Sequence, residues 1–258
     1  DASFSAMANS KGLFAYDTST NLDFTVTMRT NDGTGSGWVT RDVNDVDKFD
    51  AAEASAIAID KSLQSKNAKA IEPGKYTVIM EPAASVGLLG RMFGAFNART
   101  ADEGRSFMSK QGGGTKLGEK IVDERVNLYS DPQNEIVPTS TWAGDGQARE
   151  RKQWLKNGVV DNLFYSRYWA QQKGVDPIPS PSNGIMEGGD ASLEDLIKDT
   201  KRGVLVTRLW YIRSLDPQTL LYTGLTRDGT FFIENGKFKH CKNQSLSNVG
   251  LENQRQAL

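Results

Sequence analysis

Apolar and polar residues alternate along the first forty residues in the manner of β-strands. Phe24, Val26 and Met28 are separated by polar residues, which places the three apolar side chains on one face of a strand. An Asn-Asp-Gly turn sequence at 31–33 follows, and a second strand-like segment begins near residue 38. The pattern therefore predicts a β-hairpin.

The spacing of apolar residues then changes to that of a helix. Over residues 47–66 they form one stripe along a helix face, with Asp50 near its start. The stripe consists of Phe49, Ala52, Ala56, Ile57, Ile59 and Leu63. Residues 75–80 are continuously strand-like, and their composition is typical of a short buried strand.

A second helix is predicted to follow directly, over residues 83–96. Glu81 and Pro82 open it, because proline suits the first helical turn. Its apolar residues surround the helix almost completely, which favours a place inside the protein or at a subunit interface. Thr100 and Glu103 have the spacing of a capping box and predict a third helix to about residue 111.

The second half of the chain is rich in turn signals. A Gly-rich connection at 111–115 precedes a weakly patterned region, and two Asn-Gly pairs at 157–158 and 235–236 predict tight hairpins. A helical turn or short helix is expected at 164–172. The three prolines within 176–183 indicate an irregular loop.

A capped helix and a strand are predicted between these hairpins. Ser192 is the expected N-cap, and the acidic residues 194–195 suit the positive end of the helix dipole. The basic residues 201–202 would form the last turn, Gly203 the C-cap, and residues 204–212 a strand.

Strand groups interrupted by separate helices indicate an α+β fold with a largely antiparallel sheet and several helices packed on it. We expect one domain over residues 1–258, with a strand-helix part at about 1–120 and a hairpin-rich part at about 121–258.

Composition narrows the classes of function. The 31 basic and 32 acidic residues nearly balance, so no long-range field attracts nucleic acid or an anionic membrane. No apolar run in these residues is long enough to span a bilayer, and we expect no signal peptide. The single cysteine, Cys241, excludes an internal disulfide and fits a reducing compartment, so we expect a cytoplasmic location.

Two groups of residues invite a chemical interpretation. Tyr165, Arg167 and Tyr168 could line a cleft, with rings covering a peptide and the guanidinium meeting a carboxylate or carbonyl. The alternative is a core layer with one arginine reaching solvent. His240 and Cys241 are adjacent, so on a strand they would point to opposite faces and not converge on one ion.

Several segments resemble the TldD/PmbA family, also called TldD/TldE, which comprises zinc-dependent peptidases and their metal-free partner subunits. The resemblance is carried by residues 155–160, 165–170, 188–203 and 216–236, and it covers roughly the last two-fifths of the chain well. It implies a TldD/PmbA-like C-terminal domain. Because members carry a separate preceding domain, the chain looks like the carboxy-terminal half of a longer protein.

The zinc-binding members place His-Glu-x-x-x-His on a helix, so that two imidazoles hold zinc and the glutamate activates water. This chain contains one histidine, and its corresponding segment 81–97 carries apolar and basic side chains where ligands would be expected. These are Leu88, Leu89, Arg91 and Met92. The chain thus resembles the metal-free TldE or PmbA type, which implies no catalytic residue, metal or cofactor of its own.

The resemblance implies a non-catalytic subunit that dimerises with a family chain, zinc being held by a TldD-type partner, and that helps process small or unfolded peptides. A homodimeric binding or scaffold protein is the alternative. A metal-independent hydrolase using Ser166 or Cys241 has less support. The family has also been labelled a modulator of DNA gyrase, although the charge balance gives no support for direct DNA contact.

Overall fold

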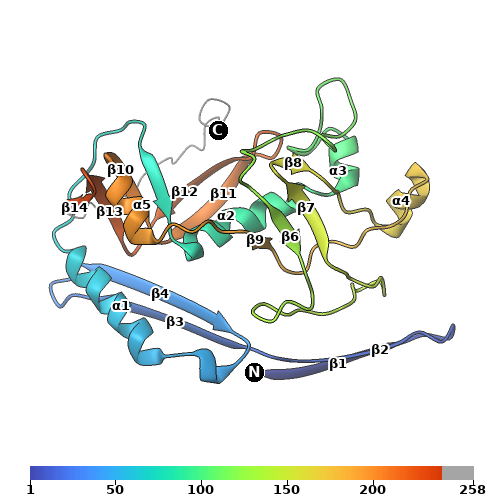
Figure 1. Cartoon of the computed structure of the whole chain (residues 1–258), viewed down its shortest axis with the longest axis horizontal. Helices are drawn as coiled ribbons and strands as arrows, with labels where there is room; N and C mark the ends of the chain where they lie inside the picture. The colour runs from blue at the N-terminus through green and yellow to red at the C-terminus, as the bar shows by residue number, and fades with distance from the viewer. Residues whose placement is uncertain (240–258) are drawn as a thin grey trace.

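The computed structural model describes residues 1–239. Its fourteen strands form two four-stranded and three two-stranded sheets, and five α-helices lie among them (Figure 1). Of the named strand pairs, only β5–β10 is parallel. The expected α+β fold with mostly antiparallel sheets is therefore confirmed.

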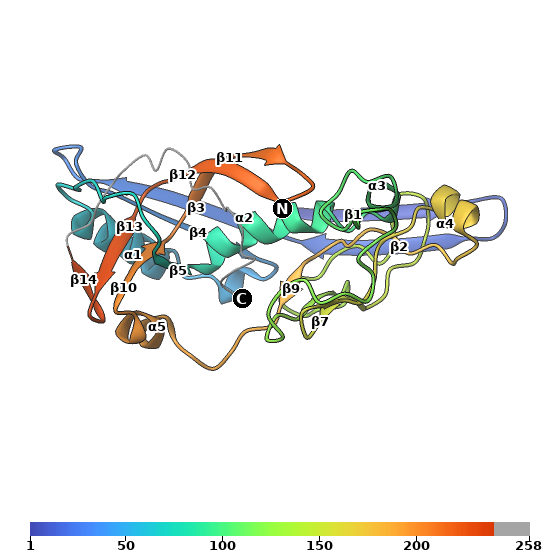
Figure 2. The same ribbon diagram turned by 90° about the horizontal axis from the view of Figure 1, so that it is seen from above.

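A long two-stranded ribbon lies along the molecule (Figure 2). β2 (Phe14–Thr20) and β3 (Leu22–Arg29) follow one another almost without interruption. β1 (Ala2–Ala8) pairs with the first of them and β4 (Ser36–Val43) with the second. The predicted hairpin is thus β3–β4, and Gly33 in its turn has the positive φ of 71° that glycine adopts without strain.

Helix α1 (Ala51–Gln64) covers one face of β3–β4, and Asp50, expected near its start, is its N-cap. The core beneath it contains Val39, Ala54 and Ala58. The approach is close, because a Cβ on Gly37 would lie 2.1 Å from the carbonyl oxygen of Ala58. Small residues on both elements are therefore what let this helix pack against the hairpin.

The first four-stranded sheet has the order β14-β13-β10-β5. Its strands are β5 (Thr77–Met80), β10 (Arg202–Val206), β13 (Thr230–Glu234) and β14 (Lys237–Lys239). Helix α5 (Leu193–Asp199) packs on one face through Leu193 and Ile197, and Ser192 forms a complete capping box with Asp195. The predicted N-terminus of this helix is confirmed.

The predicted C-terminus of α5 is wrong. The helix ends at Asp199, Thr200 is its C-cap, and Gly203 lies inside β10. Gly203 is needed there because β10 runs against β5, and a Cβ would lie 2.6 Å from the carbonyl oxygen of Thr77. The predicted strand 204–212 is also divided, since β10 ends at Val206.

The next strand, β11 (Leu209–Asp216), pairs with β12 (Leu221–Thr226) in a separate ribbon. The second four-stranded sheet has the order β8-β7-β6-β9. Its strands are β6 (Leu128–Ser130), β7 (Lys152–Lys156), β8 (Val159–Val160) and β9 (Ile185–Met186). Both Asn-Gly turns are confirmed, with Asn157 and Asn235 at φ values of 49° and 51°.

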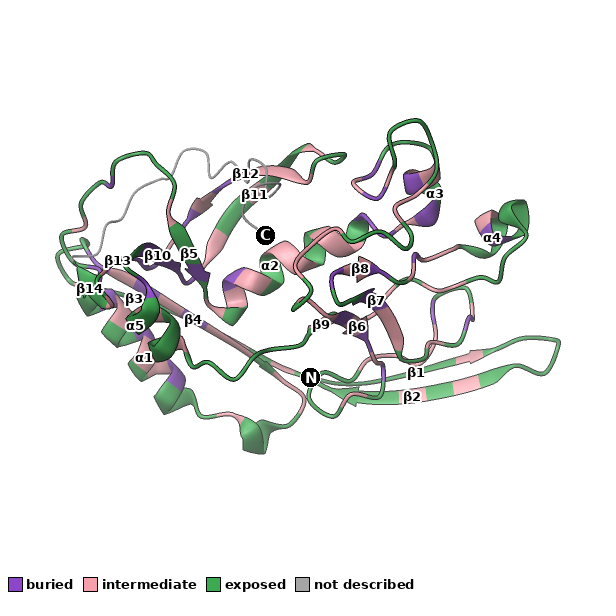
Figure 3. Ribbon diagram, turned by 45° about the horizontal axis from the view of Figure 1, so that its top comes forward, coloured by how far each residue is buried: buried purple, intermediate pink, exposed green. Residues whose placement is uncertain are grey.

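Helix α2 (Pro82–Gly94) crosses between the cores of the two four-stranded sheets (Figures 1 and 3). Ala84 lies in the core of the first, and Leu89, Met92 and Phe93 pack against the core of the second. Val86 is exposed, so residues 1–239 do not cover this apolar helix on all sides. The expectation that a partner covers it stays a prediction.

The third predicted helix, 100–111, is wrong. The structure has a short α3 (Ala98–Asp102) capped by Asn97, and Glu103 pairs with Arg99 instead of closing a capping box. Gly104 follows with a φ of 76°, which ends the helix. The remaining helices are the 3₁₀ turn η1 (Val46–Lys48) and the expected short helix α4 (Arg167–Lys173).

Within the described residues, no helix has both the length and the apolar character needed to cross a bilayer. The division of the chain at about residue 120 stays a prediction.

Candidate functional site

Helix α2 occupies the position at which the family resemblance places metal ligands. Glu81 precedes it as N-cap and donates its backbone N–H to Val206, which fixes the start of the helix on the β5–β10 sheet. The Glu81 carboxylate lies 2.6 Å from Nζ of Lys61 on α1. The start of α2 is therefore held by β10 and by α1, and a functional site requires such rigid support.

The side chains of α2 do not fit a zinc ion. Leu88, Leu89 and Met92 offer no imidazole, thiolate or carboxylate. Arg91 carries a guanidinium, which is not a zinc ligand, and it lies over the ring of Tyr222 on β12, 5.7 Å from its centre. In residues 1–239 no three His, Cys, Asp or Glu side chains are grouped so that they could hold a metal.

The predicted binding residues Tyr165, Arg167 and Tyr168 lie at the start of α4 but have different surroundings. Tyr165 is partly buried against the core of the second sheet, and burial raises the pKa of its hydroxyl. Arg167 is exposed, with Nε 3.6 Å from a carboxylate oxygen of Asp145. Tyr168 is exposed beside Arg99, whose guanidinium lies 5.9 Å from its ring centre. Their binding role stays a prediction.

Ser166, the nucleophile of the hydrolase alternative, has a structural task in this fold. Its hydroxyl oxygen accepts a hydrogen bond from the backbone N–H of Trp169 and thereby caps α4. His240 and Cys241 lie outside the described residues. Residues 1–239 contain no histidine that could serve Ser166 as a base, which weakens this alternative.

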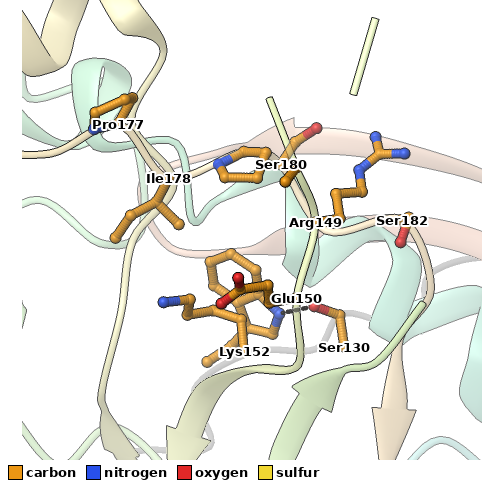
Figure 4. A pocket seen from close by; sticks show the side chains of 11 residues that line it. Ser130, Arg149, Glu150, Lys152, Pro177, Ile178, Ser180 and Ser182 are labelled. Atoms are coloured by element: carbon orange, nitrogen blue, oxygen red, sulfur yellow. Dashed lines mark hydrogen bonds between the residues drawn. The ribbon is translucent and has the colours of Figure 1, made fainter. Parts of the chain in front are cut away.

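A cavity of about 210 Å³ opens beside these residues, and sequence reasoning missed it (Figure 4). It lies between the start of β7 and the proline-rich segment 177–182. Trp154 borders it, with its indole N–H donated to Ser130 at 3.0 Å. The polar and charged residues of the wall include Arg149, Glu150, Lys152, Ser180 and Ser182.

Arg149 is the most unusual residue of this cavity. Its Nη1 donates to the carbonyl of Trp142 at 2.9 Å, whereas its Nε is buried without a hydrogen-bond partner. Burial lowers the pKa of this guanidinium, and the charge of Asp145 partly opposes that effect. The hydroxyl oxygen of Ser182 is also buried and unpaired. Nothing in the sequence distinguishes these residues, because three separate segments build the cavity.

Comparison with known families matches this architecture. Residues 73–251 match the PmbA/TldA metallopeptidase C-terminal domain, and residues 1–65 match the central domain of the same family. The chain belongs to the PmbA/TldD metallopeptidase family. The predicted family is confirmed by these matches.

Similar proteins agree with this placement. A metalloprotease of Methanothermobacter thermautotrophicus is 24% identical over 223 residues, covering 78% of this chain and 48% of the relative. A structure described as a modulator of DNA gyrase from Bacteroides thetaiotaomicron has a TM-score of 0.80 at 26% identity, over 94% of this chain and 55% of that one. This PmbA/TldD chain thus spans about half the length of such relatives.

The structure of TldE from Thermococcus kodakarensis is also similar in fold. Its TM-score is 0.72 at 22% identity, and the match covers 92% of this chain and 56% of TldE. At this identity the likeness concerns the fold alone. The likeness to TldE therefore does not show whether this PmbA/TldD chain is of the metal-free type, and that assignment must be argued from its own side chains.

Proposed function

We propose that this chain is the zinc-free subunit of a two-chain PmbA/TldD peptidase that processes small or unfolded peptides. The observation that carries the proposal is the chemistry of α2. Where zinc-binding members require imidazoles and a carboxylate, this helix presents apolar side chains and the guanidinium of Arg91. A guanidinium at that place repels a divalent cation. The zinc and its bound water would belong to the partner.

Dimerisation has support from the β1–β2 ribbon. Its register places Phe4, Phe14 and Tyr16 on one face, together with Ala6 and Ala8. The three rings are 79%, 73% and 59% exposed, which leaves roughly 300–500 Å² of aromatic surface in water. A patch of this size on a monomer is often functional. We propose that a second family chain covers this aromatic face.

Reconstitution tests the proposed function. The chain alone should not cleave an unstructured peptide, whereas a mixture with a family member that carries His-Glu-x-x-x-His should, and a chelator should stop the cleavage. As a control, that member is also assayed without this chain. Chelator-sensitive cleavage by this chain alone, with zinc bound to it, would contradict the proposal.

The same experiment separates the alternative, a homodimeric binding or scaffold protein. The exposed aromatic face favours association in either case. Under the alternative, this chain forms dimers with itself, and addition of a zinc-bearing member changes neither the size of the complex nor the rate of cleavage.

A further inference from the structure

The cavity beside β7 is held open by a rigid rim. Ile178 exchanges two backbone hydrogen bonds with Tyr165, at 2.8 and 3.0 Å. At the other end, the Asn183 amide donates to the carbonyls of Asp131 and Val137 and accepts from the Asp131 N–H. Pro179 and Pro181 stiffen the segment between these anchors. A ligand would therefore enter a preformed site, without the entropy loss of ordering a loop.

The polar side of the cavity is suited to an anion. The Arg149 guanidinium has five N–H donors, of which one has a hydrogen-bond partner in the described part of the chain. The nearby Asp145 is already engaged by Gln147 and Arg167. Nε of Arg149 is buried away from solvent, so a ligand in the cavity would meet this residue through its Nη groups. A carboxylate can pair with a guanidinium through two parallel hydrogen bonds.

The remaining walls determine what else the ligand must contain. Pro177, Ile178 and Pro179 form an apolar side. Glu150 and Lys152 carry opposite charges, so Arg149 supplies the net positive charge. The volume of about 210 Å³ corresponds to about seven water molecules, which is enough for one amino-acid residue.

We propose that this cavity binds the carboxy-terminal residue of a peptide, with its free carboxylate on Arg149 and its side chain against Ile178 and the neighbouring prolines. The choice of a peptide as the ligand rests on the proposed function. Recognition of a small carboxylate that carries an apolar side chain does not depend on it.

Calorimetry on the 258-residue chain tests this site with matched ligands. The tripeptide Ala-Ala-Leu should bind as the free acid with a dissociation constant of order 1 mM, as expected for a small ligand. Its C-terminal amide should bind about tenfold more weakly or not at all, since it lacks the charge that pairs with Arg149. Equal binding of acid and amide would overturn the proposal.

Variants and competing ligands sharpen the result. Arg149→Gln should remove the preference for the free acid, whereas Arg151→Gln, on an exposed neighbouring arginine outside the cavity, should keep it. An equal loss in both variants would contradict the site. The acid–amide comparison on the unmodified chain remains decisive if Arg149→Gln misfolds.

N-acetyl-leucine should compete with the tripeptide and inorganic phosphate should not. Effective competition by phosphate would identify a general anion site and overturn the peptide assignment. No partner chain is involved, so failure here is distinct from failure of reconstitution.

Discussion

The ion pair between Lys61 and Glu81 joins the two parts of the chain that match different family domains. Lys61 lies on α1 within the central-domain match, and Glu81 caps α2 within the C-terminal match. Their charged atoms are 2.6 Å apart, and the side chains are only 13% and 17% exposed. An ion pair this shielded from water contributes to stability mainly because each charge compensates the other, so that neither is buried without a partner.

Removal of one partner should therefore destabilise the protein. Lys61→Met leaves the Glu81 carboxylate without its partner in a largely buried position, and we expect a loss of about 3 kcal/mol in the free energy of unfolding. Lys66→Met is the matched control, because its pair with Asp32 is nearly half exposed and should contribute less than about 1 kcal/mol. Equal effects in urea denaturation would contradict this account.

A pH effect is expected at Asp123. The Arg125 guanidinium, 2.7 Å away, and the backbone N–H of Arg125 lower the pKa of Asp123 to about 2. The unfolded value is about 3.9, so this stabilisation is present above about pH 4 and is lost as the pH falls towards 2. Arg125→Gln should raise the pKa in an NMR titration of the carboxyl group. An unchanged titration would argue against the assigned cause.

At the scale of elements, local signals were sufficient for caps and turns. Asp50, Ser192 and the two Asn-Gly pairs lie where their chemistry predicts, because each needs only its neighbours in sequence. Gly203 was misassigned because its role arises from β5, which lies far away in the sequence. The same difference holds for the candidate site. The sequence pattern predicts α2, whereas the cavity of Arg149 is formed only where three separate segments meet.

Two glycines test this difference between local and tertiary roles. Gly203→Ala should destabilise the protein by about 1–3 kcal/mol, because its Cβ would collide with the Thr77 carbonyl. Gly87→Ala, within α2, meets no atom within 4 Å and should stabilise by about 0.5–1 kcal/mol, since alanine favours helix. Thermal unfolding of both variants measures the signs, and a destabilising Gly87→Ala would indicate that α2 needs flexibility there.

At the scale of the whole molecule, polar contacts bind the ribbon to the sheets. The nearly buried Asp228 carboxylate accepts from Ser36 on β4 and from Arg208, each at 2.6 Å. Arg208 also lies 4.3 Å from the ring centre of Trp38. The β3–β4 half of the ribbon is thus fixed to the body, while the β1–β2 half leaves an aromatic face in water.

That face gives a prediction about assembly. The double variant Phe4→Ser and Tyr16→Ser should lower the fraction of dimer in analytical ultracentrifugation, because it removes two exposed rings from the proposed contact. Val86→Ser, on the exposed side of α2, tests the other apolar surface that a partner could cover. If Val86→Ser dissociates the dimer and the double variant does not, the interface lies at α2 and not at the β1–β2 ribbon.

If this chain is the zinc-free subunit, it does not hold the catalytic zinc by itself. The most direct test is the metal content of the purified 258-residue chain, measured by mass spectrometry after incubation with equimolar zinc and dialysis. A zinc-bearing family member treated in parallel is the positive control. Far less than one zinc per chain is expected, and one tightly held zinc per chain would show that this chain binds the metal itself.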